Sequence, residues 1–556
     1  MHLQRIKIAD FKNLKDVEIS FSEFFERGDG GKPEQPIRSH AVIGQNGTGK
    51  SNLIEAIITI FRDVDLDNDA SLDYELDYKI RGHDITLKAD RAMGKRPVVS
   101  IDGKPSSQSQ LSKHAREYLP SHVFAYYSGK NERLEALFQT HQERFKNLLR
   151  HDGDDLVRRL FYCRGGHSQL VLLACLLSAD PVFAGLLENL KIQDLESALF
   201  VLKQPHTLRE LKDRDILEGD PRFWYARGTV VRDLLDKLWQ VAWAPIEETR
   251  EVQIDFRRRP EKQKRMYLFV PNREKLNELG EMVGTADRFF RYAEGAYIGD
   301  LLEEVRITIK KREESAGNVS FTQLSEGELQ MLTVLGLMRI THQDHCLFLL
   351  DEPDTHLNPL WKLRYFDDIN RMIAPRAGET LQGESQIIVA THDPIMVGSL
   401  RREQVRILRK IGDKSEVAAP ADHPQGMGVA GLLKSDMFGL ASTLDQQTLR
   451  DLELRNELIA KDARGELSDD EAVHLERLRH HLDELGFSRE YRDPMYQLFI
   501  QKMYEMRSQP LGKLLPPEQL KEQEELATRI ARELIARERT DDLSDLAKEL
   551  KLRLGS

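Results

Sequence analysis

The feature that most constrains this 556-residue chain is the run GQNGTGKS at residues 44–51, which fits the pattern G-x-x-x-x-G-K-[ST] at every specified position. Residues 40–43 predict a short buried strand before the run, and residues 52–60 have the apolar spacing of a helix after it. In a strand-loop-helix setting, backbone N–H groups of the loop surround phosphate groups, and the helix N-terminus adds partial positive charge. The alternative, a glycine-rich turn that matches by chance, is disfavoured by this setting. We therefore expect a nucleotide-binding site.

Each residue of this loop has an expected task. Lys50 is expected to reach the β- and γ-phosphates, and the Ser51 hydroxyl is expected to coordinate Mg²⁺. ATP and Mg²⁺ are therefore the predicted cofactors. The predicted nucleotide contacts are Gly44, Gln45, Asn46, Gly47, Thr48, Gly49, Lys50, Ser51 and Asn52.

Composition limits the class of protein. Charged residues make up 31% of the chain and apolar residues 40%, as in a globular protein, with no apolar run long enough to cross a membrane and no signal peptide at the N-terminus. We therefore expect a cytoplasmic bacterial protein with no membrane contact. The net charge of −11 argues against coating nucleic acid by bulk electrostatics, although it permits a local basic patch. Cys163, Cys175 and Cys346 lie far apart in apolar surroundings, so we expect buried thiols.

The N-terminal residues alternate between apolar and polar side chains. Residues 3–14 and 17–21 predict two antiparallel strands, and further strands are expected at 74–80, 84–89 and 98–101. Residues 123–129 predict a strand that returns to the nucleotide. In many phosphate-loop ATPases a Gln stands at that position. No Gln follows this strand directly, and Gln139 and Gln142 are only nearby alternatives. Residues 1–142 are thus expected to form an N-terminal ATPase lobe with an antiparallel sheet.

Residues 143–250 are expected to form a compact helical insertion, since apolar stretches such as 170–177 and 182–190 alternate with Asp-Pro breaks. They lack the long heptad runs of a coiled coil. Strands expected at 252–256 and 266–270 are joined by nine residues, of which six are basic. These are candidate DNA contacts, although a solvated hairpin tip is the interpretation we favour: Arg257, Arg258, Arg259, Lys262, Lys264 and Arg265.

A second chemical cluster begins at Ser325, in the sequence Ser325-Glu326-Gly327-Glu328 ahead of a predicted helix. The run resembles the signature motif of ABC-type ATPases, in which a Ser and a Gly at a helix N-terminus bind the γ-phosphate held by the opposite subunit. That resemblance assigns Ser325, Gly327 and Glu328 to a site completed in trans. A capping box formed by Ser325 and Glu328 explains the same spacing.

Five apolar residues precede Asp351 and Glu352, which we expect at the C-terminal end of a buried strand, where ligands bind in α/β sheets. Successive side chains of a strand point in different directions, so we assign Asp351 to the metal and Glu352 to the general base. A further buried strand at 386–391 ends at His392, which resembles the switch histidine that contacts the γ-phosphate in ABC-type proteins. Catalysis is therefore assigned to Glu352 and His392.

The order of these motifs resembles that of ABC/SMC-like ATPases over most of residues 1–410. The implied fold is α/β: a P-loop ATPase head with an N-terminal lobe (1–142), a helical insertion (143–250), a C-terminal lobe (251–410) and a helical C-terminal extension (411–556). We see no carboxylate pair of a nuclease after the His392 strand, so the chain is expected to lack a nuclease of its own.

More specific segments resemble the ATPase subunits of Septu-type anti-phage defence, the PtuA family, including its retron-associated members. These segments are YYSGKNERL at 126–134, LSEGELQ at 324–330, DEPDTHLNP at 351–359, LLKSDMFGLASTLD at 432–445 and GFSREYRDPMY at 486–496. The resemblance implies an ATP-bound homodimer within a larger assembly. It also implies a separate HNH nuclease, PtuB, and in retron-associated systems a reverse transcriptase with its msDNA.

Two other classes remain as alternatives. A DNA-repair ATPase of the RecF or SMC type would act on DNA directly. An ABC transporter subunit is disfavoured by the N-terminal strands and the long charged tail. In that tail, residues 446–485 and 515–553 have helical spacing, with Leu475, Leu478, Leu482 and Leu485 recurring every three or four positions. This stripe either packs internally or docks a partner.

Overall fold

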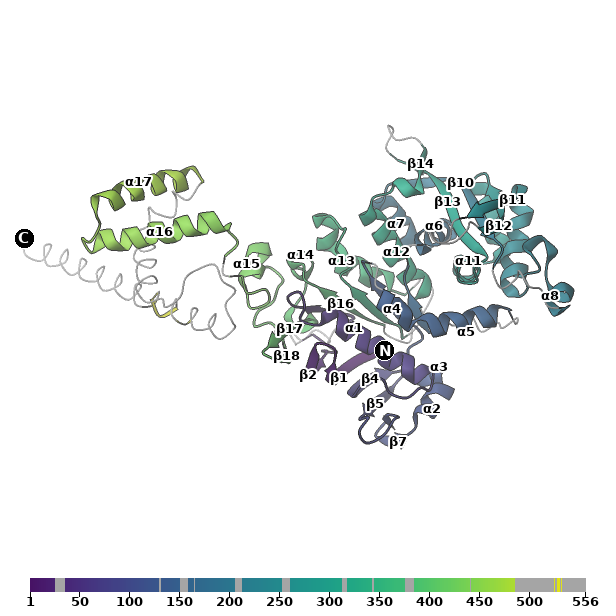
Figure 1. The fold of residues 1–556 in the computed structure, drawn as a ribbon, viewed down its shortest axis with the longest axis horizontal. Coiled ribbons are helices and arrows are strands. Elements are labelled where there is room, and N and C mark those ends of the chain that lie inside the picture. Colours follow the sequence, from purple (N-terminus) through teal and green to yellow (C-terminus); the bar gives the residue numbers. More distant parts are fainter. Residues whose placement is uncertain are drawn as a thin grey trace, which may run out of the picture. The chain divides into compact units, whose positions relative to one another are not determined.

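The computed structural model describes residues 1–25, 36–129, 132–150, 159–164, 166–205, 213–252, 261–312, 318–342, 345–375, 385–440 and 442–485, together with 525, 528–530 and 532. The chain forms two units, Met1–Gln425 and Gly426–Ser556, which are described separately (Figure 1). Among the described residues, no helix combines the length and the apolar character that crossing a membrane requires.

A seven-stranded sheet forms the centre of the first unit. Its strands, in spatial order, are β18 (Lys414–Ala418), β17 (Val405–Ile411), β3 (Ser39–Ile43), β16 (Gln386–Thr391), β15 (Leu347–Asp351), β8 (Val123–Tyr127) and β9 (Leu160–Tyr162). All neighbours are parallel except β17 and β18. The strands β3, β15 and β16 are buried along their whole length, as continuous apolar strands of a covered parallel sheet should be. The expected end of the ATPase lobe at residue 410 is too early, because β18 pairs with β17 and completes this sheet.

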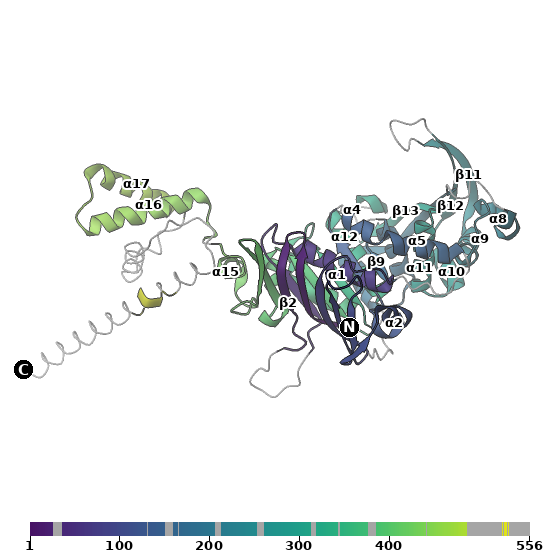
Figure 2. The ribbon, with the colours of Figure 1, turned by 60° about the horizontal axis from the view of Figure 1, so that its bottom comes forward.

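A six-stranded antiparallel sheet confirms the expected N-terminal lobe. Its spatial order is β2 (Leu14–Ser20), β1 (His2–Phe11), β4 (Tyr74–Ile80), β5 (His83–Ala89), β6 (Val98–Ile101) and β7 (Lys104–Ser106). Its edge strand β2 lies against β18, and Figure 2 shows the N-terminal strands beside the strands of the central sheet. The short helices α2 (Gln108–Lys113) and α3 (Ala115–Tyr118) follow it.

A third sheet, called the insertion sheet below, corrects the expectation of a purely helical insertion at 143–250. It extends the insertion to Ser320. It is antiparallel, in the order β11 (Trp243–Val252), β12 (Glu261–Val270), β10 (Ile192–Lys203), β13 (Leu302–Lys311) and β14 (Asn318–Ser320). The sequence IQDLESALFVLK of β10 places apolar residues at spacings of three before a continuous apolar run, so its pattern does not separate a strand from a buried helix. β12 begins at Glu261, five residues before the strand expected at 266–270, and residues 253–260 lie outside the described residues.

Helices of the insertion and of the C-terminal lobe surround these sheets. The first group comprises α4 (Glu132–Leu137), α5 (Gln139–Arg150), α6 (His167–Leu177), α7 (Pro181–Asn189), α8 (Asp213–Glu218), the 3-10 helix η2 (Pro221–Phe223), the π-helix η3 (Val231–Leu235), α9 (Asp236–Val241), α10 (Arg273–Val283) and α11 (Ala286–Ile298). The second comprises the 3-10 helix η4 (Phe321–Gln323), α12 (Glu326–Thr341), α13 (Pro359–Met372), α14 (Pro394–Val397) and the 3-10 helix η5 (Arg402–Gln404). The helices expected near 170–177 and 182–190 are confirmed. Cys163, Cys175 and Cys346 are buried free thiols, as expected.

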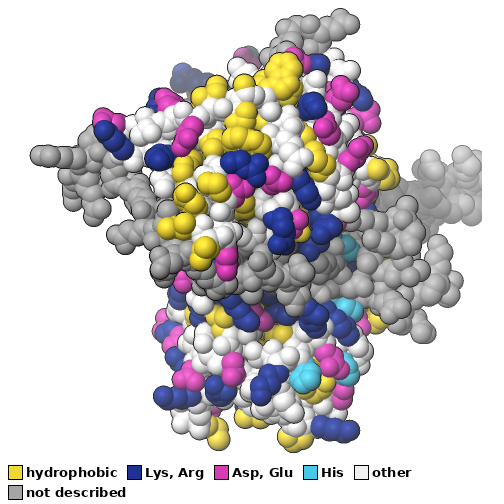
Figure 3. Space-filling model, turned by 90° about the vertical axis from the view of Figure 1, so that its right-hand side faces the viewer, with side chains coloured by type: hydrophobic (Ala, Val, Ile, Leu, Met, Phe, Trp, Pro, Cys, Tyr) yellow, Lys and Arg dark blue, Asp and Glu magenta, His cyan; other side chains and the backbone are white. Residues whose placement is uncertain are grey.

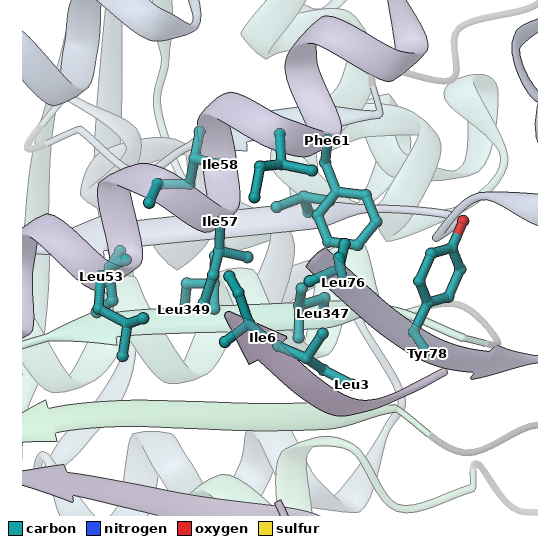
Figure 4. Packing of buried hydrophobic residues seen from close by; sticks show 14 of the residues in the cluster. Leu3, Ile6, Leu53, Ile57, Ile58, Phe61, Leu76, Tyr78, Leu347 and Leu349 are labelled. Atoms are coloured by element: carbon teal, nitrogen blue, oxygen red, sulfur yellow. The ribbon is translucent and has the colours of Figure 1, made fainter. Parts of the chain in front are cut away.

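Helix α1 (Lys50–Asp65) carries the phosphate loop and packs between the N-terminal sheet and the central sheet. Its apolar residues, including Leu53, Ile57 and Phe61, lie in one buried cluster with side chains of β1, β4 and β15 (Figure 4). Twelve of its sixteen residues are buried, so the helix is held from both sides rather than by one amphipathic face.

The second unit contains α15 (Gly428–Lys434) and a helical hairpin of α16 (Gln446–Ala463) and α17 (Asp469–Glu484). Leu475 and Leu478 pack on Leu458 of α16, and Leu482 is also buried, whereas Leu485 is 51% exposed. Most of the predicted leucine stripe therefore packs internally. The predicted helix over 515–553 lies largely outside the described residues.

The position of Ile57 at the centre of the buried cluster predicts a large effect of truncation. Ile57→Ala should lower the free energy of unfolding by about 2–5 kcal/mol, because the side chain is fully buried and its removal leaves a cavity. Denaturant unfolding followed by circular dichroism measures this. The control Met93→Ala, at a side chain 88% exposed, should change stability by less than about 0.5 kcal/mol. Equal effects of the two changes would contradict the described packing.

Candidate nucleotide-binding and hydrolysis site

The phosphate loop joins β3 to α1 in a backbone conformation that requires glycine. Gly49 has φ of 111°, and a Cβ there would lie 2.5 Å from the Leu14 side chain. The Lys50 ammonium donates to the Gly44 carbonyl at 2.7 Å and to the Gln45 carbonyl at 3.2 Å, so it lies across the loop. Burial lowers the pKa of Lys50, and the charges of Glu352 and Asp351 oppose that shift. The loop thus holds a cation and a helix N-terminus at the place predicted for phosphates.

The turn between β1 and β2 supports this loop, a contact that the sequence reasoning missed. The Asn13 amide donates to the Gly47 carbonyl at 2.7 Å and accepts from Asn52 at 2.5 Å. Lys12 forms an ion pair with Glu55 of α1. A polar Asn at a hairpin turn looks like ordinary turn chemistry, so only the fold brings it to the loop.

Asp351 ends β15 beside the phosphate loop and fits a divalent cation. Its side chain is fully buried, and neither carboxylate oxygen has a partner in full hydrogen-bond geometry among the described residues, although the Ser51 hydroxyl is close enough to affect its pKa. Burial raises the pKa of Asp351 to about 6, and the Ser51 hydroxyl and Lys50 pull it down. A bound Mg²⁺ would supply the missing partner for this carboxylate, with Ser51 as a second ligand, and would neutralise phosphate charge. The residues present therefore fit the metal that the phosphate loop implies.

The structure brings together Glu352 and His392, the two residues to which catalysis was assigned from sequence. The Glu352 Oε1 atom lies 3.2 Å from Nδ1 of His392, which follows β16. Glu352 has φ of 48°, an uncommon conformation for a residue with a side chain. Its backbone is held on both sides, since its N–H donates to the Ala390 carbonyl at 2.8 Å and its carbonyl accepts from the Thr355 hydroxyl at 3.0 Å. Because of this turn, the side chains of Glu352 and Asp351 point in different directions.

The end of β8 brings Ser128, not a Gln, to this edge of the sheet. The Ser128 N–H donates to the Asp351 carbonyl at 3.4 Å, and its hydroxyl lies 2.9 Å from the Thr355 hydroxyl. The two alternatives named from sequence lie elsewhere: Gln139 is exposed at the start of α5, and Gln142 accepts a hydrogen bond from Arg164 at 2.8 Å.

The signature residues lie at the N-terminus of α12, where they line a surface pocket of about 560 Å³. The capping box is present, because the Ser325 hydroxyl accepts from the Glu328 N–H at 3.2 Å and the Glu328 carboxylate accepts from the Ser325 N–H at 2.8 Å. Ser325 nevertheless remains exposed. A Cβ on Gly327 would lie 2.5 Å from the His356 carbonyl, so glycine is needed for this close approach. The pocket is lined by Ser325, Glu326, Gly327, Glu328, His356, Asn358 and Trp361.

The candidate DNA contacts are only partly described. Arg257, Arg258 and Arg259 lie outside the described residues. Lys262 and Lys264 are exposed on β12, whereas Arg265 is buried and pairs with Glu303 at 2.7 Å. Arg265 is therefore corrected from a DNA contact to an internal ion pair. The sequence did not reveal this, because Arg265 is also paired with Lys203 of β10, a strand distant in the sequence, on the side of β12 away from β11.

The geometry defines the class of protein. A phosphate loop after β3, an orphaned carboxylate at the end of β15 and a Glu-His pair beside it all lie at the carboxyl edge of one parallel sheet. These features are those of an α/β fold with a phosphate-loop nucleotide site at the edge of its central parallel sheet.

Comparisons with known proteins add a partial family match. Residues 185–397 match the model of the family described as "AAA domain, putative AbiEii toxin, Type IV TA system". The chain also has structural similarity to the "SMC head domain from Thermotoga maritima", with 15% sequence identity and a TM-score of 0.30 over 75% of this chain and 99% of that one. No curated protein matches the sequence.

The position of Lys50 predicts that Lys50→Ala abolishes ATP binding, because the change removes the ammonium that lies across the phosphate loop. Isothermal titration calorimetry with ATP and Mg²⁺ measures this. Lys113→Ala, at an exposed residue of α2, is the matched control and should bind like the wild type. Equal affinity of the Lys50 variant would refute the assignment.

Substitutions of Glu352 and Thr355, which are joined by a hydrogen bond in the turn after β15, should affect ATP hydrolysis to different extents. Glu352→Gln should bind ATP but hydrolyse it at least about 10²-fold more slowly, on the scale of a lost general base. Thr355→Val should lower kcat by about two- to tenfold with KM unchanged, because it removes one hydrogen bond that holds the Glu352 backbone. Steady-state phosphate release measures both. Wild-type turnover of the Glu352 variant would make Glu352 a structural residue.

Proposed function

We propose that this chain binds and hydrolyses ATP, dimerises head to tail around two ATP molecules, and regulates a separate nuclease subunit in anti-phage defence. The observation that carries the enzymatic part is the 3.2 Å contact between Glu352 and His392 beside Asp351, at the sheet edge that also holds the phosphate loop. Mg²⁺ bound to ATP would supply electrostatic stabilisation of the transferred phosphoryl group. Glu352 would accept the proton of the attacking water, and His392, at hydrogen-bond distance from Glu352, would orient the Glu352 carboxylate.

The composition of the signature pocket supports a dimer. Its lining contains residues of α12 and of the segment after β15, but none of the phosphate loop residues 44–52. A γ-phosphate in contact with Ser325 would therefore come from another copy of the chain. Two chains related by a twofold axis would complete two such sites, each with one phosphate loop and one signature.

The role in defence rests on the sequence resemblance to the PtuA family. In this proposal the nuclease chemistry belongs to an HNH partner of the PtuB type, and retron-associated systems would add a reverse transcriptase and its msDNA. The unit after Gln425 is the candidate partner-binding part, because its helical hairpin keeps apolar side chains at the surface, including Val473 at 54% and Leu485 at 51% exposure.

The insertion offers a second candidate surface for a partner. Figure 3, which faces the side where the insertion lies in Figure 1, shows hydrophobic side chains gathered over part of that surface. Within the part of the insertion that the structure describes, the large exposed apolar residues are Ile216, Leu217, Trp243, Ile246 and Phe269. Trp243 and Phe269 are directly paired across β11 and β12, so this apolar surface is continuous over both strands.

Complementation between inactive chains tests the dimer. Ser325→Arg blocks the signature and Lys50→Ala blocks the phosphate loop, so each homodimer should be inactive. Mixing them should restore ATPase activity, because a heterodimer has one site with both parts intact. The control is a mixture of Ser325→Arg with the double variant Ser325→Arg/Lys50→Ala, which has no intact site. A stable heterodimer without recovered activity would count against the head-to-tail arrangement.

Removal of the chain after Asp445 tests partner docking. The truncated protein should keep its ATPase activity, since every proposed catalytic group lies in the unit Met1–Gln425, and should lose the nuclease in co-purification. The matched control keeps the full chain and replaces Trp243 and Ile246 with Ser on β11. If the truncated protein retains the nuclease and this control loses it, the interface lies on the insertion.

A further inference from the structure

The first turn of α12 carries two carboxylates, Glu326 and Glu328, at the end of the helix proposed to accept a phosphate. The partial positive charge of a helix N-terminus favours anions, but a fixed carboxylate in the same turn repels a second anion. An ATP-dependent dimer through this signature therefore requires something that offsets the charge of these side chains.

Lys311 at the end of β13 is placed to offset Glu328. Its ammonium donates to Oε1 of Glu328 at 2.7 Å, while Oε2 of the same carboxylate is 3.0 Å from the Ser325 hydroxyl. The side chains of Lys311 and Glu328 are 17% and 18% exposed, so the pair is poorly screened by solvent. Burial raises the pKa of Glu328, but the hydrogen bonds from Lys311 and Ser325 outweigh it and leave the pKa below its ordinary value.

The other carboxylate is held more loosely. Glu326 lies 3.0 Å from Nδ1 of His356, but its side chain is 79% exposed. Water already screens Glu326, so its repulsion of an incoming phosphate is small. Glu328 is thus the carboxylate whose charge most needs a partner.

The chain path ties the same strand to the signature. β13 pairs with β14 from Thr308↔Ser320 to Lys310↔Asn318, and β14 leads through η4 directly to Ser325. The insertion sheet is therefore linked to the signature turn twice, once along the chain from β14 through η4 and once through the ion pair of Lys311 with Glu328. A displacement of β13 would alter both the position of Ser325 and the charge balance at Glu328.

We propose that Lys311 is a positioning residue, which neutralises Glu328 so that the signature turn can accept the γ-phosphate of ATP bound to a second copy of this chain. This inference rests on the proposed head-to-tail dimer. The insertion sheet then takes part in ATP-dependent dimerisation, because it supplies Lys311, while the N-terminus of α12 supplies the turn that accepts the phosphate.

The test uses full-length protein with Glu352→Gln, which is expected to hold ATP, and measures the dimer dissociation constant with ATP and Mg²⁺ by analytical ultracentrifugation. Lys311→Met should weaken the dimer by about 30-fold or more, because the unpaired Glu328 carboxylate would then face the phosphate of the other chain, and like charges juxtaposed at an interface cost several kcal/mol. Lys311→Arg should retain it. The matched control is Lys310→Met, since Lys310 is on the same strand but pairs with Glu196 at the surface. The ATP affinity of the monomer should match that of the control.

A charge-removal variant separates compensation from simple packing. Glu328→Gln keeps the capping box, which Gln also forms, but removes the carboxylate charge. Added to Lys311→Met, it should restore the dimer to within about threefold of the starting protein, since no charge is then left to offset. Failure of this rescue, or equal behaviour of the Lys311 and Lys310 variants, would overturn the inference while leaving the dimer itself intact. If the Glu352→Gln protein bound ATP without dimerising, both the proposed dimer and this inference would fall.

Discussion

Helix α1, buried between two sheets, is the constraint on which the rest of the site depends. The phosphate loop is held at one end by β3 and at the other by a helix that packs on β1, β4 and β15 at once. A loop of this kind binds phosphate through backbone N–H groups, so its geometry is only as fixed as the elements at its ends. The hairpin turn at Asn13 adds a side-chain contact to Gly47 and connects the N-terminal lobe directly to the loop.

Two features at the carboxyl edge of the central sheet are energetically unfavourable, and the surrounding structure must compensate for them. Asp351 is a buried carboxylate without a partner in full hydrogen-bond geometry among the described residues, and Glu352 has a left-handed backbone conformation. Features of this kind destabilise a fold by about 1–3 kcal/mol each and persist where the surrounding structure determines them. Here the surroundings are a parallel sheet buried on both faces and hydrogen bonds from Thr355 and to Ala390. The arrangement fits the proposed metal-dependent ATPase, because the same carboxylate that is unfavourable alone would become a ligand of a bound Mg²⁺.

The parts that sequence predicts well are those where local pattern and tertiary role agree. The phosphate loop, the apolar strands before Asp351 and His392, and the alternating N-terminal strands follow directly from residue spacing. Glu352 and His392 follow the neighbouring parallel strands β15 and β16, which brings them to 3.2 Å, a contact that the sequence did not predict. Prediction fails where burial on both faces removes periodicity, as in β10, and where a strand distant in the sequence pairs beside a basic residue, as β10 does at Arg265. Contacts between distant segments, such as Asn13 with the loop and Lys311 with Glu328, leave no local signal.

The central claim is that each ATP site is completed by the signature of a second copy. Site-specific cross-linking measures it directly, and the three native thiols Cys163, Cys175 and Cys346 are buried, which favours reaction at introduced ones. In the Glu352→Gln protein, one chain carries Asn46→Cys in the phosphate loop and the other carries Glu326→Cys beside the signature, both at exposed positions. A short bis-maleimide should join the two chains when ATP and Mg²⁺ are present and should not join them without nucleotide or with Lys50→Ala in the Asn46→Cys chain. Absence of the ATP-dependent cross-link in protein shown to bind ATP would contradict the account.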